Sequence, residues 1–268
     1  MNEILAIALQ SMQADIGRLD RVAMNLAHAQ TPGYKRELQS ASFSSHMVAA
    51  HAAQATQATP AAQGVAEDAT SPSPAAAAPT YIDHRPGALQ ATGQKLDLAI
   101  AGAGWFEVPT PEVPAYTRNG AFQLDAQGRL VTASGRHPVM GTDGEIRLSH
   151  GAPVIDARGR VFEGALPGAA PSRNDGVPLA QLKLVQLDDK LPVRRIGDGL
   201  VVTDASVTAI NESQAEIRQG HLENANVSTL HETLQLMQAM RHVETMQKVA
   251  LGYDEMLGAA LRKLGETA

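Results

Sequence analysis

Glycines and histidines are the first candidates in this chain for cofactor binding and metal binding. Gly102 and Gly104 follow a predicted strand and match the start of a dinucleotide-binding fingerprint. The third glycine and the following helix are missing, so a tight turn is the favoured interpretation. None of the nine histidines lies in an HExxH motif or another compact ligand spacing. We expect no metal and no cofactor, and we expect the following to be surface residues: His46, His51, His84, His137, His150, His221, His231 and His242.

Acidic residues could act as a general acid and base if two carboxyl groups faced each other across a groove. Asp188 and Asp189 are the most conspicuous pair, but adjacent carboxylates after a strand are typical of a solvated turn. The Asp/Gly turns at 125–128 and 143–144 lack the further carboxylates of an EF-hand. No Gly-x-Ser-x-Gly motif is present. The sequence therefore indicates a protein that is not an enzyme.

Composition narrows the class further. The chain has 268 residues and a net charge of -6, which argues against a nucleic-acid partner because such proteins normally carry a basic face. It has no cysteine, which fits the cytosol and equally a protein exported unfolded. The first ten residues lack the basic start of a secretory signal. No apolar run is long enough for membrane insertion.

The ends of the chain carry the elements that must position any site. Apolar residues three and four apart predict a long helix near each terminus, and each helix presents one apolar seam. We expect the two helices to pack together or onto copies of themselves, because either alone would be marginal in water. Thr229 and Glu232 form a predicted capping box, and Gly265 is the predicted stop. The seams are Leu5, Leu9, Met12, Ile16, Leu19, Ala23 and Leu26, and Leu236, Ala239, Val243, Met246, Ala250, Tyr253, Leu257, Ala260 and Leu264.

The first helix should end near Gln30, because Thr31 precedes Pro32 and Gly33 permits a turn. Residues 25–36, NLAHAQTPGYKR, closely resemble the N-terminal signature of the flagellar axial proteins, the rod and hook family. His28 stands where that family usually has Asn. A lone histidine at a helix end is more often a capping or surface residue than a ligand.

The middle of the chain changes character twice. Residues 39–80 are rich in Ala, Pro, Gln, Ser and Thr and predict a linker, disordered when free, with an alternative of short helix at 43–58. After Gly93 the apolar period becomes two, with glycine turns that predict an antiparallel β module. Within it we expect a two-residue hairpin at 119–120 and further strands at 179–187 and 199–202.

The same resemblance extends to the centre and to the C-terminal part. Residues 96–108, 116–120 and 128–132 are similar to the shared β core of the rod and hook proteins. The run LENANV at 222–227 is close to the family's L-E-N-S-N-V and departs only at Ala225. Residues 241–244, RHVE, stand where the family usually has R-x-Y/F-E, so one aromatic contact is missing.

This resemblance implies a mainly β central domain, antiparallel and irregular, with long N- and C-terminal α-helices that form a coiled-coil-like inner domain. The expected parts are 1–38 and 221–268 in the inner domain, the linker 39–80 and the β domain 81–220. Asn25 and Asn224 are expected to set register at the helix ends. The expected subunit-assembly residues are Leu5, Met12, Ile16, Leu19, Ala23, Asn25, Leu26, Thr31, Pro32, Gly33, Tyr34, Leu222, Glu223, Asn224, Asn226, Val227, Leu236, Val243, Met246, Tyr253 and Leu257.

The implied function is a structural subunit of the bacterial flagellar basal-body rod. Its implied partners are other rod proteins, copies of itself and the flagellar type III export apparatus. The resemblance places it in the periplasm-spanning rod, exported without a cleaved signal peptide. An alternative is a trimeric coiled-coil fibre or adhesin-type binding module with a β insert. Such a fibre would share the apolar seams but would not be expected to share the two terminal signatures.

Overall fold

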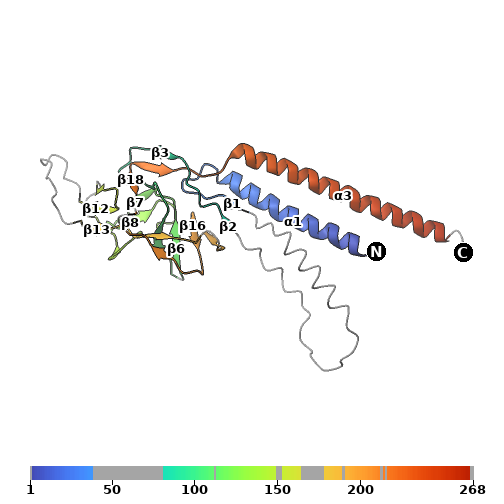
Figure 1. The fold of residues 1–268 in the computed structure, drawn as a ribbon, viewed down its shortest axis with the longest axis horizontal. Coiled ribbons are helices and arrows are strands. Elements are labelled where there is room, and N and C mark those ends of the chain that lie inside the picture. Colours follow the sequence, from blue (N-terminus) through green and yellow to red (C-terminus); the bar gives the residue numbers. More distant parts are fainter. Residues whose placement is uncertain are drawn as a thin grey trace, which may run out of the picture.

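Two helices project side by side from a β region in the computed structural model (Figure 1). The structure describes residues 2–38, 81–111, 113–148, 153–163, 178–188, 191–211, 214 and 216–265. Helix α1 spans Asn2–Ala27 and α3 spans Thr229–Gly265. They run antiparallel, so the start of α1 and the end of α3 both lie far from the strands. The predicted central β region with a helix at each end is confirmed, whereas its coiled-coil packing stays a prediction.

The described strands pair antiparallel. The largest sheet has the order β15 (Arg194–Gly197), β16 (Leu200–Val202), β6 (Pro114–Thr117), β5 (Trp105–Pro109), β14 (Leu184–Gln186) and β17 (Thr208–Ala209). A second has β11 (Val154–Ile155), β12 (Arg160–Phe162) and β13 (Ala180–Gln181). The remaining pairs are β1 (Glu37–Leu38) with β2 (Tyr81–Ile82), β3 (Leu89–Ala91) with β19 (His221–Glu223), β4 (Leu98–Ile100) with β18 (Ile217–Gln219), β7 (Phe122–Leu124) with β8 (Leu130–Thr132), and β9 (Met140–Gly141) with β10 (Gly144–Glu145).

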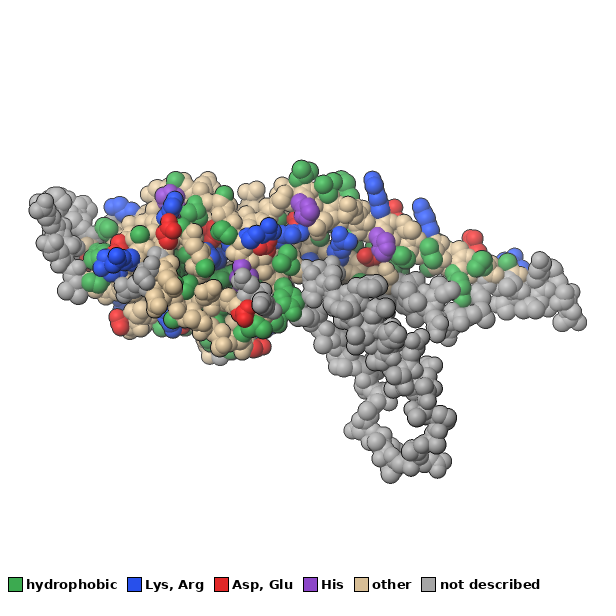
Figure 2. Space-filling model, viewed as in Figure 1, with side chains coloured by type: hydrophobic (Ala, Val, Ile, Leu, Met, Phe, Trp, Pro, Cys, Tyr) green, Lys and Arg blue, Asp and Glu red, His purple; other side chains and the backbone are tan. Residues whose placement is uncertain are grey.

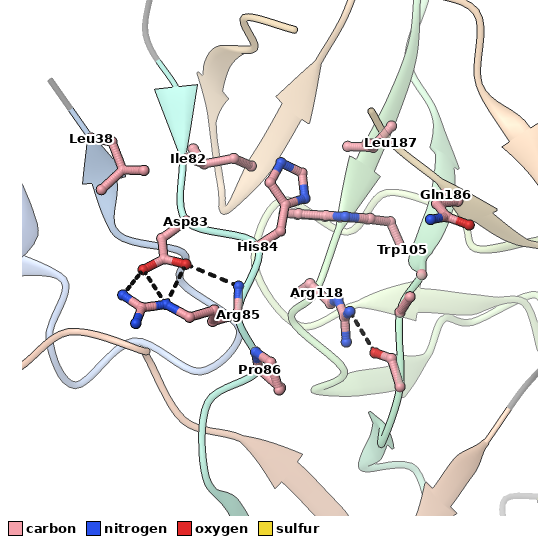
Figure 3. Close-up of a pocket in the computed structure, with 13 residues that line it drawn as sticks. Leu38, Ile82, Asp83, His84, Arg85, Pro86, Trp105, Arg118, Gln186 and Leu187 are labelled. Atoms are coloured by element: carbon pink, nitrogen blue, oxygen red, sulfur yellow. Dashed lines mark hydrogen bonds and ion pairs between the residues drawn. The ribbon is translucent and has the colours of Figure 1, made fainter. Parts of the chain in front are cut away.

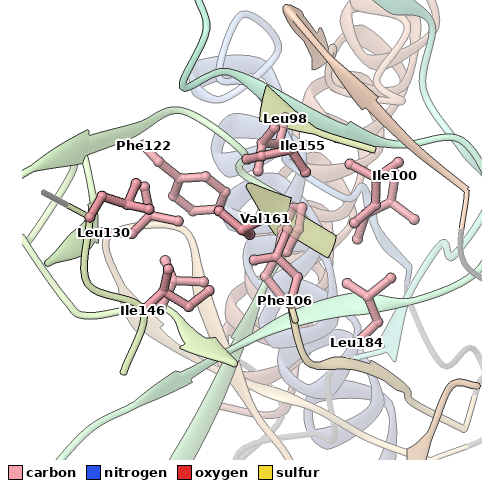
Figure 4. Packing of buried hydrophobic residues seen from close by; sticks show 13 residues of the cluster. Leu98, Ile100, Phe106, Phe122, Leu130, Ile146, Ile155, Val161 and Leu184 are labelled. Carbon is pink, nitrogen blue, oxygen red and sulfur yellow. The ribbon is translucent and has the colours of Figure 1, made fainter. Parts of the chain in front are cut away.

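The main core of the β region lies between these small sheets (Figure 4). Phe106 of β5 packs edge to face on Phe122 of β7, with ring centroids 5.1 Å apart. Leu98, Ile146 and Leu184 come from other strands and loops and are buried around them. Because each sheet contributes only a few residues, the strands depend on one another for burial.

The predicted hairpin at Asn119-Gly120 is wrong. Strand β6 pairs with β5 and β16, whereas β7 pairs with β8, so the two predicted arms belong to different sheets. Gly120 is required for another reason. A Cβ there would lie 1.6 Å from the carbonyl oxygen of Leu98, because the backbone of β4 crosses at this point. The glycine permits a close approach and not a reversal.

Of the other predicted turns and strands, some are confirmed and one is wrong. The turn at 125–128 is confirmed and joins β7 to β8, with Gly128 at φ 74°. The turn at 143–144 is confirmed between β9 and β10. The single strand predicted at 179–187 is instead β13 and β14, which lie in separate sheets. The linker predicted at 39–80 lies outside the described residues.

The apolar seam of α3 is confirmed as the side that faces α1. Ala239 is fully buried, and Leu236, Val243, Met246, Ala250 and Tyr253 are half-buried, while the residues between them are exposed. Leu257, Ala260 and Leu264 fall outside the described side chains. The three-and-four spacing therefore identified the packed face of this helix correctly.

The buried side of α1 differs from the predicted seam. Asp15, Val22 and Asn25 are buried, whereas Ile16 and Ala23 are exposed. Met12, Leu19 and Leu26 are half-buried, and Leu5 and Leu9 fall outside the described side chains. A polar pair explains part of this rotation, because the Oδ2 of Asp15 lies 2.5 Å from the Nδ1 of His242 on α3.

Both helix ends at the β region differ in detail from expectation. Helix α1 ends at Ala27, three residues before the predicted Gln30. The predicted capping box of Thr229 and Glu232 is wrong, because α3 already begins at Thr229 and the Ser228 hydroxyl lies 3.5 Å from the amide nitrogen of His231. The Glu232 carboxylate is turned to the N-terminal motif and not to the cap.

Candidate assembly site at the helix–β junction

The two terminal motifs meet where the helices join the β region. The amide of Gly33 donates to the carbonyl oxygen of Glu223 at 2.7 Å, and the amide of Asn226 donates to that of Tyr34 at 3.3 Å. These residues are nearly 200 positions apart in the chain, so the contact is purely tertiary. We call this region, in which residues 25–37 contact 83–87, 118 and 223–232, the junction.

Asn25 is the polar centre of the helix side of the junction and is 1% exposed. Its Oδ1 accepts from the Tyr34 hydroxyl at 3.1 Å and from the Glu37 amide at 2.8 Å. Its Nδ2 donates to the Glu37 carbonyl at 3.1 Å and to Glu232 at 3.4 Å. An amide with both ends used in this way fixes the chain that leaves α1 against the start of α3.

Glu223 is the polar centre of the β side and is 1% exposed. Its Oε1 accepts from the Lys35 Nζ at 2.6 Å and from the Gly87 amide at 2.7 Å. Its Oε2 accepts from Arg118 at 3.2 Å. One carboxylate thus holds two cations, one from the N-terminal motif and one from the end of β6.

These cations are held at an electrostatic cost. Burial lowers the pKa of Lys35 and of Arg118, and the negative charge of Glu223 opposes that shift in both. Arg118 also donates to the carbonyl oxygens of Ile100 at 3.2 Å and Gly102 at 2.7 Å. The Lys35 Nζ donates in addition to the carbonyl of Arg85 at 2.9 Å. Such carbonyl contacts compensate the charges in part for the water that they have lost.

A second ion pair links the start of α3 to the N-terminal motif. Glu232 is fully buried and accepts from the Nε of Arg36 at 2.5 Å. The amide of Arg36 donates to the Oδ1 of Asn226 at 2.7 Å. The Nδ2 of Asn226 donates to the carbonyls of Asp83 and Arg85, at 2.8 and 2.9 Å. Asn226 therefore joins three segments of the chain through one side chain.

Tyr34 closes the outer side of the junction. The guanidinium of Arg195 lies 4.2 Å from its ring centroid, and the imidazole of His28 stacks on it at 4.9 Å. Burial raises the pKa of Tyr34 to about 12. The His28 ring also lies 3.1 Å from the Thr31 hydroxyl.

The sequence predicted several of these positions and missed others. Asn25, Tyr34, Glu223 and Asn226 are brought together, and Gly33 is in the left-handed region at φ 70°. The side chain of Asn224 is exposed, whereas that of Asn226 accepts a hydrogen bond from the Arg36 amide. Thr31, Pro32, Leu222 and Val227 are half-buried beside the junction. The missed residues are Lys35, Arg36, Arg118, Arg195 and Glu232; only the position of the first two inside the motif 25–36 could have pointed to them.

A pocket of about 520 Å³ opens beside the junction (Figure 3). Arg118, Trp105 and His84 line it, and the two rings meet edge to face at 5.9 Å. His84 is thus half-buried and not the surface residue predicted. Asp83 beside it is held by Arg85, whose hydrogen bonds lower the Asp83 pKa.

Gly102 and Gly104, which the sequence singled out, also line this pocket. Gly102 and Gly104 lie in the bend between β4 and β5, so the predicted turn is confirmed. Asp188 is exposed, and Asp189 lies outside the described residues. Within the described part of the chain, no three His, Asp or Glu side chains gather in a way that could hold a metal ion. The described helices include none that is long and apolar enough to cross a membrane.

Comparison with known proteins identifies related chains. Residues 99–161 match the family model for the flagellar hook protein FlgE/F/G D1 domain, and residues 218–263 match the flagellar basal body rod FlgEFG protein C-terminal model. The flagellar basal-body rod protein FlgF of Rhizobium meliloti is 31% identical over 186 residues, which cover 69% of this chain and 73% of the relative.

Two further relatives extend over almost the full length. The rod protein FlgG of Agrobacterium fabrum is 29% identical over 270 residues, covering 97% of this chain and 98% of the relative. The rod protein FlgF of Salmonella typhimurium is 28% identical over 267 residues, covering 97% of each. Among these relatives, FlgF is the more frequent match, with FlgG second. The two matched segments include β5 to β11 and most of α3, and with the relatives they establish that the chain belongs to the flagellar basal-body rod protein family.

Proposed function

We propose that this chain is a structural subunit of the flagellar rod that polymerises through its terminal helices and transmits torque. The observation that carries the proposal is the surface of the projecting helix pair. Leu230, Leu234 and Met237 of α3 are 72%, 51% and 51% exposed, and Leu251 and Met256 are both 66% exposed. Figure 2 shows apolar side chains recurring along this part of the molecule, between charged ones.

Such a surface favours assembly on physical grounds. Covering one exposed Leu or Met contributes roughly 1.5–3 kcal/mol, so a few of them decide whether helices associate. Helix α1 adds Ile16 and Met24, which are 52% and 46% exposed. The partners proposed are other rod proteins and further copies of this chain. Membership of the basal-body rod protein family supports the rod proposal over the fibre alternative.

The remaining parts of the proposal follow from the same family. The chain is exported through the flagellar type III export apparatus without a cleaved signal peptide, and it acts without catalysis, cofactor or nucleic acid. The inner domain is formed by 1–38 and 221–268, with 81–220 outside it and 39–80 as linker. The assembly contacts proposed are the residues of the two motifs and seams named above.

Truncation of α3 tests the function. A strain that lacks the chain is complemented with the full chain or with a version lacking residues 236–264, and swimming and isolated basal bodies are compared. We expect the truncated version to be produced but to give no swimming and no complete rod. A matched control carries Glu216→Gln, which changes an exposed strand-end residue of the β region. Normal swimming with the truncated chain would reject the proposal.

A further inference from the structure

A polar cavity of about 440 Å³ lies where α1, α3 and β1 come together. Arg18 and Arg21 of α1 and Arg36 of the motif line it, together with Glu37, Glu232 and Gln235. Arg18 and Arg21 are three residues apart, so they lie on the same side of α1, about 4.5 Å apart along the helix axis at ~1.5 Å per residue.

The carboxylates of this cavity are already engaged. Glu232 pairs with Arg36 at 2.5 Å, and Glu37 pairs with Arg195 at 2.7 Å. Of the other acidic groups of this helix segment, Asp15 pairs with His242, and the exposed Asp20 favours the charged form of Arg21 without an ion pair. In the described part of the chain, Arg18 and Arg21 lie in no ion pair.

These two guanidinium groups are also partly desolvated. Both side chains are only partly exposed, and burial lowers the pKa of Arg21, with Glu37 opposing that shift. Glu37 and Asp20 favour the charged form of Arg21 without forming an ion pair with it, so a carboxylate that entered the cavity would add a direct, charge-assisted hydrogen bond. The planar guanidinium group of arginine can donate two parallel hydrogen bonds to one carboxylate.

The surroundings indicate where the carboxylate comes from. Val22 of α1 and Leu38 of β1 line the cavity beside its charged residues, so apolar side chains lie next to the arginines. Charged residues rimmed by apolar side chains match a helix of another protein better than a free ion. The chain's net charge of -6 also disfavours nucleic acid and anionic membranes as its source.

We propose that this cavity binds acidic side chains from a helix of a neighbouring rod subunit, with Arg18 and Arg21 as the residues that bind them. Two carboxylates three or four residues apart on the partner helix would match the spacing of the two arginines. The inference rests on the proposed function and adds to it a defined charge contact beside the apolar one.

Binding is tested with purified full-length chain and a fluorescently labelled oligo-glutamate peptide as the probe. We expect salt-sensitive binding, and we expect Arg18→Gln with Arg21→Gln to weaken it about tenfold, which corresponds to ~1.4 kcal/mol. The variant Arg18→Lys with Arg21→Lys should retain most of the binding. The matched control is Arg158→Gln with Arg194→Gln, which removes two exposed charges from the β region and should bind as the unchanged chain does.

The outcomes separate this inference from the proposed function. Equal binding by the double Gln variant and the unchanged chain would overturn it, as would inorganic sulfate displacing the peptide at equal concentration. In the complemented strain, the double Gln variant should swim poorly at normal protein level, whereas the control pair should swim normally. If α3 truncation abolishes swimming while the double Gln variant swims fully, the carboxylate contact is rejected and the rod function stands. Helix content, measured by circular dichroism, verifies folding, and the single Gln variants serve if the double one unfolds.

Discussion

The β region and the helix pair bury their large apolar side chains to very different degrees. Phe106 and Val108 in the β region are fully buried, and Leu98 beside them is too. On α3, Leu230 and Leu251 are 72% and 66% exposed. The β region therefore buries most of its large apolar side chains, although Val154 and Leu179 are 55% and 50% exposed. The helix pair buries apolar side chains mainly on the side where the two helices face each other. The junction joins the two regions through buried charges. Its contribution to stability can be measured directly, and it tests how strongly the helix pair depends on the β region.

The largest effect is expected for Glu223→Gln. This change leaves Lys35 and Arg118 buried without their carboxylate, and breaking a buried pair costs about 3–5 kcal/mol. Urea unfolding followed by Trp105 fluorescence measures it. Glu216→Gln is the control, because Glu216 pairs with Arg218 at the surface, and it should change stability by less than about 0.5 kcal/mol. Equal effects of the two changes would mean that the junction does not bind the regions together.

A smaller loss is expected for Gly33→Ala. Gly33 has φ 70°, and a Cβ there would lie 2.3 Å from the backbone carbon of Arg118. We expect a cost of roughly 2–4 kcal/mol from strain and displacement of the junction. Gly93→Ala is a matched control, because Gly93 has φ 72° but nothing within 4 Å of its Cβ position. It should cost only about 1–2 kcal/mol, and a cost equal to that of Gly33→Ala would contradict the close packing at the motif.

Tyr34→Phe should remove about 1 kcal/mol, the hydrogen bond from the hydroxyl to Asn25. It also carries a pH signature. Because burial raises the pKa of Tyr34 to about 12 from 10.0, the folded state favours the neutral phenol. The corresponding stability is fully present below pH 10 and is lost as pH rises towards 12. Unfolding curves across this range should fall less steeply for Tyr34→Phe than for the unchanged chain; identical slopes would place Tyr34 in water.

The smallest effect on the isolated chain is expected for Leu234→Gln with Met237→Gln. Both side chains are about half exposed, so stability should change by less than about 0.5 kcal/mol. Phe106→Ala in the β core should cost about 3–5 kcal/mol by comparison. Swimming of the complemented strain provides the second measurement, since the helix variant should lose assembly without losing stability. A large stability loss in the helix variant would show that α3 is already covered within one chain.

Local patterns predicted the elements better than their partners. The three-and-four spacing located both helices and identified the packed face of α3, because burial on a helix follows its period. Asn119-Gly120 looked like a hairpin by composition alone, yet Gly120 serves a contact with Leu98, more than twenty residues earlier in the chain. Glu232 looked like a capping residue until its partner, Arg36, was known. The buried charges of the junction pair residues from opposite ends, and no local rule reports such pairs.

The positions of the junction's charged residues along the chain set the order in which the protein can fold. Lys35 and Arg36 sit close to one end, and the carboxylates that neutralise them, Glu223 and Glu232, sit close to the other. If the N-terminal part of the chain emerges first, Lys35 and Arg36 stay solvated and unpaired until most of the chain has followed. If the C-terminal part emerges first, the same holds for Glu223 and Glu232. The ion pairs of the junction can therefore form only as a last step of folding. A chain that ends before Glu223 and Glu232 cannot form them.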